Sequence, residues 1–387
     1  MKIEIVEDIS QLDERAWNRL NHEQYPFLQH EFLLAAERSG CVSPASGWTP
    51  RHIALFDDGG ILQAAMPLYE KTHSWGEFVF DWAWAQAYER AGLEYYPKLV
   101  AAAAFTPAPS RRILLADDAD TDAANQVLES ALELAQKEQF SSLHIQFPHP
   151  DELPLLAKAG FKLRKDCQFH WHNRGYASFD AFLQQFSSAK RKNVRRDRRR
   201  VAEQGIELRW LHGGDMDASL WNDVFALIST TFRRRGSIPY FNLDFFIEVS
   251  RRLADKIAVV IAEHQQQTIA AAVFYVGGHS LYGRYWGSHA PYDALHFETC
   301  YYQGIEYCIA HRLQHFEPGT QGEHKISRGF SPVTTWSAHW LKHAQFFAAI
   351  GHYLDAEQRH IEDYVDAVHR HSPYRKSSGN PAPEDSS

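Results

Sequence analysis

One pattern that occurs twice limits the folds open to this chain. Residues 53–69 and 259–275 are each 17 residues long and consist of an apolar run, a polar turn and a second apolar run, as in a β-hairpin. At one constant offset the two stretches share three residues, namely Ala64/Ala270, Ala65/Ala271 and Tyr69/Tyr275. The elements predicted around them follow the same order in both places. We therefore interpret the chain as a duplication of one α/β module with mixed sheets.

Hydrophobic periodicity and turn residues predict the elements of two modules, residues 1–175 and 176–371. Strands of the first are expected at 2–6, 51–56, 61–69, 96–105, 111–115, 143–147 and 161–171. Its helices are expected at 10–20, capped by Ser10, and at 31–38, 82–91, 122–139 and 151–159. The second module is expected to have strands at 206–211, 257–262, 268–276, 280–287, 315–317 and 333–339. Its expected helices are 179–204, 218–232, 243–254, 297–311 and 344–368. Pro, Ser and Gly dominate residues 372–387, which we predict to be a disordered tail.

Length and composition agree with two soluble domains. The chain has 387 residues, of which 44% are hydrophobic and 23% charged, which excludes a disordered or collagen-like protein. Its longest apolar run, 99–105, is much shorter than the roughly 18 residues of a membrane span. The N-terminus has no signal-peptide pattern, and the four cysteines are scattered without CxxC spacing. We therefore expect a cytoplasmic protein with reduced thiols, Cys300 and Cys308 being core residues.

Positive charge is concentrated in one predicted helix. The formal net charge is −8, yet residues 190–200 contain eight Lys or Arg and one Asp. Like charges at helical spacing destabilise a helix unless an anion relieves them. We predict a phosphate or RNA contact, such as tRNA, through Lys190, Arg191, Arg195, Arg198 and Arg199. The alternative is a solvated helix paired with acidic residues of the same protein.

Acidic and aromatic residues follow the first hairpin. N-acylation needs a base that takes a proton from an ammonium group, and Asp81 is the candidate. Its neighbours Phe80 and Trp82 are expected to desolvate it and raise its pKa. Residues expected to bind substrate nearby are His73, Glu77, Trp82 and Tyr96. The alternative is aromatic packing, with Asp81 capping the next helix.

A polar glycine-rich loop, 319–329, follows the last short strand of the second module. Glycines allow backbone N–H groups to converge on an anion, and a cation completes such a cage. We predict Lys325 as a catalytic residue, with Gly319, Gly322 and Arg328 binding substrate. The alternative is a long surface turn. The 22 histidines form no HExxH motif, so no metal site is predicted.

The order of helices, hairpin, helix and strand resembles the acyl-CoA N-acyltransferase (GNAT) fold. A tandem pair of such modules resembles the Fem-type aminoacyl transferases of bacterial cell-wall synthesis, which also place a basic helix like 188–208 at the start of the second module. Segments 67–84, 95–98 and 319–330 resemble the FemAB-like subfamily. Those enzymes have a lysine shortly before a Gly-Phe pair. Here Ser327 stands two residues before Gly329, and the nearest bases are Lys325 and Arg328.

The resemblance implies a transferase that moves an acyl or aminoacyl group onto an amine. The implied donor is an aminoacyl-tRNA and the implied acceptor a peptidoglycan precursor, with no firm cofactor. Acidic residues precede the helix at 122–139 where a pyrophosphate-binding loop would be needed, which disfavours acetyl-CoA. Two alternatives remain: an acyl-CoA-dependent N-acyltransferase acting on another amine, and a non-catalytic module that binds cell-wall precursor or nucleic acid. Because no Ser/His/Asp or Cys/His motif is present, we expect direct attack without a covalent intermediate.

Overall fold

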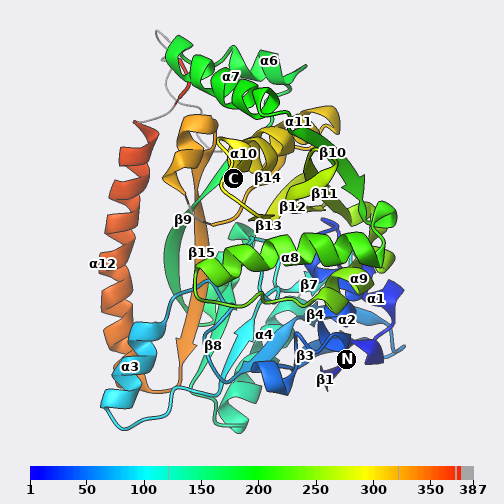
Figure 1. Ribbon diagram of the computed structural model, residues 1–387. Coiled ribbons are helices and arrows are strands. Elements are labelled where there is room, and N and C mark those ends of the chain that lie inside the picture. Colours follow the sequence, from blue (N-terminus) through cyan, green and yellow to red (C-terminus); the bar gives the residue numbers. More distant parts are fainter. Residues whose placement is uncertain (121, 321, 371–372, 376–387) are drawn as a thin grey trace.

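The computed structural model describes residues 1–120, 122–320, 322–370 and 373–375 (Figure 1). The first half contains the strands β1 (Lys2–Val6), β2 (Trp48–Pro50), β3 (His52–Phe56), β4 (Leu62–Met66), β5 (Leu68–Lys71), β6 (Lys98–Ala101), β7 (Leu114–Leu115), β8 (Ser142–Gln146) and β9 (Lys162–His172). Its helices are α1 (Glu14–Arg19), α2 (His30–Arg38), α3 (Trp82–Arg90), α4 (Ala123–Lys137) and α5 (Leu153–Lys158).

The second half repeats this order of elements. Its strands are β10 (Glu207–His212), β11 (Ile257–His264), β12 (Gln267–Val276), β13 (Ser280–Ser288), β14 (His315–Glu317) and β15 (Ser331–Leu341). Its helices are α6 (Phe179–Leu183), α7 (Ser188–Glu203), α8 (Ala218–Arg234), α9 (Leu243–Arg252), α10 (Leu295–Phe297), α11 (Gln303–Ala310) and α12 (Ala344–His369). A π-helical turn, η7 (Glu298–Tyr302), joins α10 to α11, and a 3-10 helix, η8 (Glu323–Arg328), precedes β15.

Both predicted hairpins are present, and each leads to a parallel strand pair. The hairpin strands β3 and β4 pair antiparallel in the first half, as β11 and β12 do in the second. The parallel pairs are β6 with β8 and β13 with β14. Parallel neighbours need a crossover connection, which α4 supplies in the first half and α11 in the second. The repeated strand order agrees with a duplicated module.

The two hairpins differ at Pro67. In the first half Pro67 lies between β4 and β5, and the two strands join different sheets, the four-stranded sheet β1-β3-β4-β7 and the eleven-stranded sheet. Proline has no N–H for a continuous ladder. The corresponding strand of the second half, β12, is unbroken over ten residues and stays in one sheet. The two halves thus differ at Pro67: the first half divides its strands between two sheets there, and the second half does not.

The last strands of the two halves are exchanged. The large sheet has the order β10-β11-β12-β13-β14-β9-β15-β8-β6-β5-β2. β15 of the second half pairs with β8 of the first, and β9 of the first half pairs with β14 of the second. β9 and β15 also pair with each other, from Ser331↔His170 to His339↔Lys162. The two halves therefore share one continuous sheet.

Helices pack on both sheets. α12 runs along β9 and β15 of the large sheet, and α8 packs on its strands β12 and β13, whereas α4 packs on β3 and β4 of the four-stranded sheet and on β8 (Figure 1). α6 and α7 lie at the top of the view, at the opposite end from α3. No helix in the described ranges is long and apolar enough to cross a bilayer.

Several sequence-based expectations were wrong in detail. Asp13, not Ser10, caps α1, because its carboxylate accepts from Ala16 N at 2.9 Å. The predicted helix 179–204 is interrupted between α6 and α7, where Phe186 is buried and Ser187 N donates to Pro373 O at 3.0 Å. The strand predicted at 333–339 extends over Ser331–Leu341 because it pairs along β9. Of the predicted tail, 373–375 pack there, and the rest lies outside the described residues.

Candidate active site

The residues selected from the sequence gather in two clusters, one in each half. His73, Glu77, Asp81 and Tyr96 surround Lys98 in the first half, whereas the glycine-loop residues Gly319, Gly322, Lys325 and Arg328 follow β14 in the second. β15 links the two regions, because its residue Ser331 pairs with His170 and its residue His339 with His144. At about 3.3 Å per residue, these two ends of β15 are about 25 Å apart. Asp81 and Lys325, both predicted to be catalytic, therefore do not meet at one reacting centre.

Lys98 is the centre of the first-half cluster and is completely buried. Its ammonium donates to Ser74 Oγ and to Glu77 Oε2, each at 2.9 Å, and to Asp81 Oδ2. Gln146 Nε2 adds a hydrogen bond to Glu77 Oε2 at 2.7 Å. Each of the two carboxylates therefore has one oxygen paired with the buried ammonium.

The other predicted residues of this region lie around that ion cluster. Tyr96 Oη is 2.8 Å from Ser74 Oγ, and the half-buried His73 has its Nε2 3.0 Å from Ser46 O. Trp82 is 37% exposed and contacts the edge of Trp75. The sequence segment 73–82 is thus brought together around Lys98, a residue that was not predicted.

Asp81 differs from the expectation in two respects. Although it precedes α3, its side chain caps no backbone N–H of that helix. Its Oδ2 instead accepts from Lys98 and Tyr95, and its Oδ1 has no partner in the described residues. Burial would raise the pKa of Asp81, but the charge and hydrogen bond of Lys98 lower it to about 2. The predicted rise was wrong, because the sequence did not show that a buried ammonium lies against the carboxylate. A carboxylate with so low a pKa is a weak general base.

Glu317 and Arg284 form the centre of the second-half cluster. They lie on the neighbouring parallel strands β14 and β13, and Arg284 Nη2 is 3.8 Å from Glu317 Oε2, too long for a hydrogen bond. Their side chains are only 6% and 11% exposed. Within the described part of the chain, Glu317 Oε2 and the Nε and Nη2 atoms of Arg284 have no hydrogen-bond partner. Burial raises the pKa of Glu317 to about 7, although Arg284 and Arg112 act in the opposite direction.

The first half supplies one wall of this cluster. Arg112 is fully buried, donates to Gln146 O at 2.7 Å and to Ala108 O at 2.8 Å, and acts electrostatically on Glu317. Tyr25 Oη also donates to Ala108 O, at 2.9 Å. The Arg284 guanidinium lies 4.9 Å from the centre of the Phe27 ring. The Glu317–Arg284 cluster is therefore located at the junction of the two halves.

The predicted glycine loop places Lys325 beside this cluster. Lys325 is 1% exposed, and its ammonium donates to Gly319 O. Burial, followed by the charge of Arg284, lowers the pKa of Lys325 to about 7. A simple surface turn, the alternative considered from the sequence, would leave this lysine in solvent. Gly319 and Gly322 have φ of +94° and +116°, which glycine adopts without the steric cost of a Cβ.

Arg328 connects the loop to the basic helix. Its guanidinium lies 3.4 Å from the centre of the Phe297 ring, and its Nη2 is 3.4 Å from Asp197 Oδ2 on α7. Tyr302 Oη donates to the same carboxylate oxygen at 2.9 Å. Asp197, the one acidic residue of the basic segment, thus fixes α7 against the loop that carries Lys325.

The charges of α7 divide into paired and unpaired groups. Arg198, predicted to bind RNA, forms two hydrogen bonds with Glu306, at 2.9 and 2.7 Å, and a third with Glu298, so it holds α7 on the protein. Three further ion pairs are Arg195–Asp180, Arg199–Glu203 and Arg200–Asp293. The cations without an ion pair in the described residues are Lys190, Arg191, Lys192 and Arg196. The alternative hypothesis, that this helix pairs with acidic residues of the same protein, thus holds for half of the basic residues in 190–200.

Sequence reasoning missed Glu317, Arg284 and Arg112 as site residues. Glu317 had a visible signal, since it is a charged residue at the end of a short strand and opens the Glu317-Pro-Gly319 motif. No sequence signal indicated Arg284 or Arg112. The two residues are far apart in the chain, and only the tertiary structure places both near one carboxylate.

Comparison with solved structures identifies the fold. The crystal structure of FemX matches with a TM-score of 0.51 and 13% identity, covering 80% of this chain and 92% of that chain. The C-terminal domain of a putative lysylphosphatidylglycerol synthetase from Agrobacterium fabrum matches with a TM-score of 0.55 and 10% identity, covering 90% and 97%. L-PGS from Bacillus licheniformis gives 0.50 and 11%, covering 86% and 98%. Together with the strand order, these matches confirm the mixed α/β fold of two tandem GNAT-like modules.

Comparison at the level of sequence identifies the family. No curated protein matches this sequence. The family described as FemAB-like, peptidoglycan biosynthesis/recognition, matches residues 8–376, which is nearly the whole chain. The chain therefore belongs to the FemAB-like family of peptidoglycan biosynthesis or recognition proteins.

Proposed function

We propose that this protein is a transferase that moves an acyl or aminoacyl group onto an amine of a peptidoglycan precursor, at the Glu317–Arg284 cluster. The observation that carries the proposal is a buried carboxylate and guanidinium that face each other at 3.8 Å with unpartnered polar atoms, at the end of a parallel strand pair. Buried polar groups are normally hydrogen-bonded, so these atoms are suited to a bound substrate. The FemAB-like family and the tandem GNAT-like fold support the same class of reaction.

The chemistry needs a base, and Glu317 has suitable properties. An acceptor ammonium must lose a proton before its nitrogen attacks an ester or thioester carbonyl carbon. Glu317, with a pKa of about 7, takes that proton at neutral pH. The tetrahedral oxyanion is stabilised by the Arg284 guanidinium, and its collapse breaks the bond to the leaving oxygen or sulfur, which takes a proton. Lys325, whose pKa is also about 7, supplies that proton and then takes the second proton from the nitrogen that has attacked, which leaves the amide.

The donor proposed is an aminoacyl-tRNA, bound by the unpaired cations of α7. Through Asp197 and Arg328, α7 is attached to the loop that carries Lys325, so a donor lying on α7 is close to the Glu317 cluster. Such a donor places the reaction in the cytoplasm. An acyl-CoA donor is the alternative, and acidic residues ahead of α4 argue against it in the first half.

Binding of bulk tRNA tests the donor. Fluorescence anisotropy is measured at several salt concentrations for the protein and for a variant with Lys190, Arg191, Lys192 and Arg196 changed to Gln. Each lost phosphate contact lowers the slope of log K against log salt by about 0.7 to 0.9. Arg209→Gln is the matched control, because Arg209 is an exposed arginine of β10 paired with Glu263. Binding that the four-residue variant leaves unchanged contradicts a tRNA site on α7, and displacement by acetyl-CoA favours the acyl-CoA alternative.

Transfer itself separates an enzyme from a binding module. Bulk tRNA charged with radiolabelled amino acids is incubated with a soluble peptidoglycan precursor, and label in the precursor is counted. Glu317→Gln is expected to remove transfer while precursor binding remains. Precursor binding without transfer by the unaltered protein contradicts the proposal and favours the non-catalytic alternative.

A further inference from the structure

Four aromatic side chains are strongly exposed within the described ranges, and they lie on neighbouring elements. Trp75, Phe80 and Trp82, which are 59%, 63% and 37% exposed, come from the segment before α3 and from its first residue. Tyr353 of α12 is 51% exposed. α3 packs on α12 through a buried apolar cluster, beside the lower end of α12 in Figure 1. Exposed apolar side chains that gather on one surface mark sites of interaction, and none of these four takes part in the proposed transfer.

One arginine of β9 connects the segment before α3 to α12. Arg164 Nη1 donates to Phe80 O at 2.9 Å, while its Nε and Nη2 atoms donate to the Glu357 carboxylate at 2.7 and 2.8 Å. Tyr353 Oη donates to the same carboxylate at 3.1 Å. The residues that carry the exposed rings of Phe80 and Tyr353 are therefore held through one guanidinium. Because these bonds exist without a ligand, little ordering is needed when a ligand binds to the surface.

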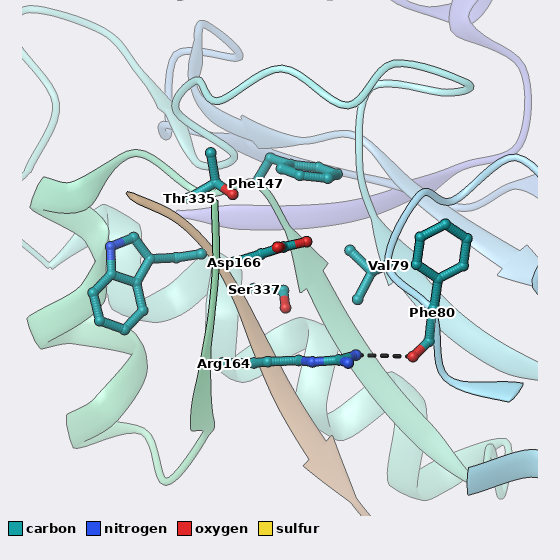
Figure 2. Close-up of a pocket in the computed structure, with 8 residues that line it drawn as sticks. Val79, Phe80, Phe147, Arg164, Asp166, Thr335 and Ser337 are labelled. Atoms are coloured by element: carbon teal, nitrogen blue, oxygen red, sulfur yellow. Dashed lines mark hydrogen bonds between the residues drawn. The ribbon is translucent and has the colours of Figure 1, made fainter. Parts of the chain in front are cut away.

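A small pocket opens beside Phe80. Arg164 and Asp166 are two positions apart on β9, so their side chains lie on the same face of the sheet, and Thr335 of β15 is paired with Asp166. Figure 2 shows the Arg164 guanidinium and the Asp166 carboxylate extending from β9 toward Val79 and Phe80, which also line the pocket. The cavity has a volume of about 30 Å³. A space of that size holds one water-sized group, such as a single hydroxyl.

The polar groups of this pocket are not all satisfied by the protein. Thr335 is 1% exposed, and its Oγ1 has no hydrogen-bond partner in the described residues. Asp166 Oδ1 accepts from Cys167 N at 2.7 Å, which leaves Oδ2 as an acceptor. Arg164 uses three of its five N–H groups in the bonds to Phe80 and Glu357, which leaves two donors. A hydroxyl group both donates and accepts hydrogen bonds, so it matches this set.

We propose that this surface binds a neutral pyranose sugar, with a sugar ring on the exposed ring of Phe80 and one hydroxyl in the pocket. A pyranose with equatorial hydroxyls has apolar C–H groups on its faces and hydroxyls along its edge. The electron-rich face of an aromatic ring attracts such C–H groups, and the pocket accepts a hydroxyl from the edge.

The charges and the unpaired hydroxyl of the surface disfavour other classes of ligand. The carboxylates of Asp166 and Glu357 repel a phosphate group placed on this surface. An acyl chain over the pocket would leave the buried Thr335 hydroxyl without a partner, and an unpaired buried hydroxyl costs free energy. A neutral ligand with an apolar face and hydroxyls at its edge meets neither difficulty.

Ligand-observed NMR tests the proposal, and it needs no transfer activity. Saturation-transfer difference spectra of the full chain are recorded with cellotriose, maltotriose and N-acetylchitotriose, since Trp75, Trp82 and Tyr353 offer further aromatic rings to an oligosaccharide. We expect saturation of the ring C–H protons of at least one of these sugars. Sorbitol, which has hydroxyls but no ring, is the control ligand and is expected to give no signal. Absence of saturation transfer to all three sugars overturns the proposal, and so does an equal signal from sorbitol.

Variants locate the bound sugar. Phe80→Ala removes the ring and is expected to raise the Kd about 5- to 10-fold, and Thr335→Val removes the free hydroxyl and is expected to raise it about 3- to 10-fold. Because Thr335 Oγ1 has no partner in the described residues, Thr335→Val is expected not to lower the Tm. Ile61→Ala is the matched control, because Ile61 is a 51% exposed apolar side chain in the turn between β3 and β4.

Two outcomes with these variants contradict the site. A Kd that is the same in Phe80→Ala as in Ile61→Ala overturns the place of the sugar. A Kd that rises in Phe80→Ala but not in Thr335→Val overturns the role of the pocket, which then holds an ordered water only. Thermal unfolding verifies that each variant is folded.

Discussion

The two halves of the molecule bury charge in different ways. In the first half, Lys98 contacts Glu77 at 2.9 Å and also Asp81, and the cluster is closed from solvent. In the second half, Arg284 and Glu317 stay 3.8 Å apart, and Arg284 Nε and Nη2 have no partner in the described residues. One cluster thus has its cation in contact with both carboxylates, although Glu77 Oε1 and Asp81 Oδ1 have no partner in the described residues, whereas in the other cluster the carboxylate and the guanidinium are not in contact.

The difference shows why a carboxylate near a predicted active site is not by itself a base. Contact with Lys98 lowers the pKa of Asp81 to about 2, whereas the more distant Arg284 and Arg112 leave that of Glu317 at about 7. At Glu317 the effect of burial exceeds that of the cations, and at Asp81 Lys98 reverses it. Contact alone is not enough, because burial raises the pKa of Glu77 although Glu77 also contacts Lys98. Four sets of measurements, on variants of both halves and over a range of pH, are expected to sharpen or break this comparison.

The largest expected effect is on transfer. Glu317→Gln removes the proposed base and is expected to lower kcat about 100- to 10,000-fold. Glu77→Gln, the equivalent change in the Lys98 cluster, is expected to change kcat much less, because the hydrogen bonds of Glu77 go to Lys98 and Gln146 rather than to the groups of the proposed reaction. Rates are measured with labelled aminoacyl-tRNA and precursor. Equal losses in both variants would contradict the assignment of the reaction to the second half.

The next effect is on stability, and it concerns the closed cluster. Lys98→Met leaves two buried carboxylates without their cation and is expected to lower the free energy of unfolding by about 3 to 5 kcal/mol. Adding Asp81→Asn and Glu77→Gln to that variant is expected to restore part of the loss. Urea unfolding curves give both values. If Lys98→Met unfolds at the same urea concentration as the unaltered chain, the three groups do not form a buried ion cluster.

Asp81 and Glu317 are also expected to respond to pH with opposite sign. The folded pKa of Glu317 is raised from 4.5 to about 7, so its contribution is present below about pH 4.5 and lost as pH rises to about 7, up to about 3 kcal/mol. The folded pKa of Asp81 is lowered from 3.8 to about 2, so its contribution is present above about pH 3.8 and lost as pH falls to about 2. Urea unfolding between pH 2 and 8 measures both. In Glu317→Gln, the free energy of unfolding should no longer fall between about pH 4.5 and 7, and its course at lower pH should not change. If the variant loses stability over that range as the unaltered chain does, the raised pKa of Glu317 is refuted.

The smallest expected effect is on stability and concerns the N-caps of α1 and α8, which are matching helices of the two halves. Asp13 accepts from Ala16 N at 2.9 Å before α1, and Asp217 accepts from Leu220 N at 2.8 Å before α8. Replacing either by Ala is expected to cost about 1 kcal/mol of unfolding free energy. Ser10→Ala is the control, since Ser10 caps no α-helix, and a change there is expected to stay within about 0.5 kcal/mol. A cost at Ser10 equal to that at Asp13 would contradict the observed cap.

Local patterns predicted most elements because their causes are local. The hairpins at β3–β4 and β11–β12, the helix α4 and the short strand β14 follow from apolar periodicity and turn residues within a few positions. The predicted helix 179–204 failed where a distant segment intervened, since residues 373–375 bond to the backbone around Phe186. A pattern in 179–204 alone contains no information about that partner.

Part of the candidate site could likewise be predicted from local sequence, and part could not. The Glu317-Pro-Gly319 motif and Lys325 were visible in the sequence, because several glycines and a lysine occur within one short loop. Their position beside Arg284 and Arg112 was not visible, and neither was the pairing of Asp81 with Lys98. A pKa depends on the charges and the water around a group, and those are set by contacts between distant segments.

By itself, the sequence determined a duplicated α/β module, a basic segment and the residues that carry the family resemblance. Only the tertiary structure decided that the last strands of the two halves are exchanged, so that β9 and β15 join both modules in one sheet. The physical reason is that hydrogen bonds between strands depend on which segments meet, and the exchange satisfies the same backbone groups as an unexchanged pairing would. That exchange places β15 between the two charged clusters.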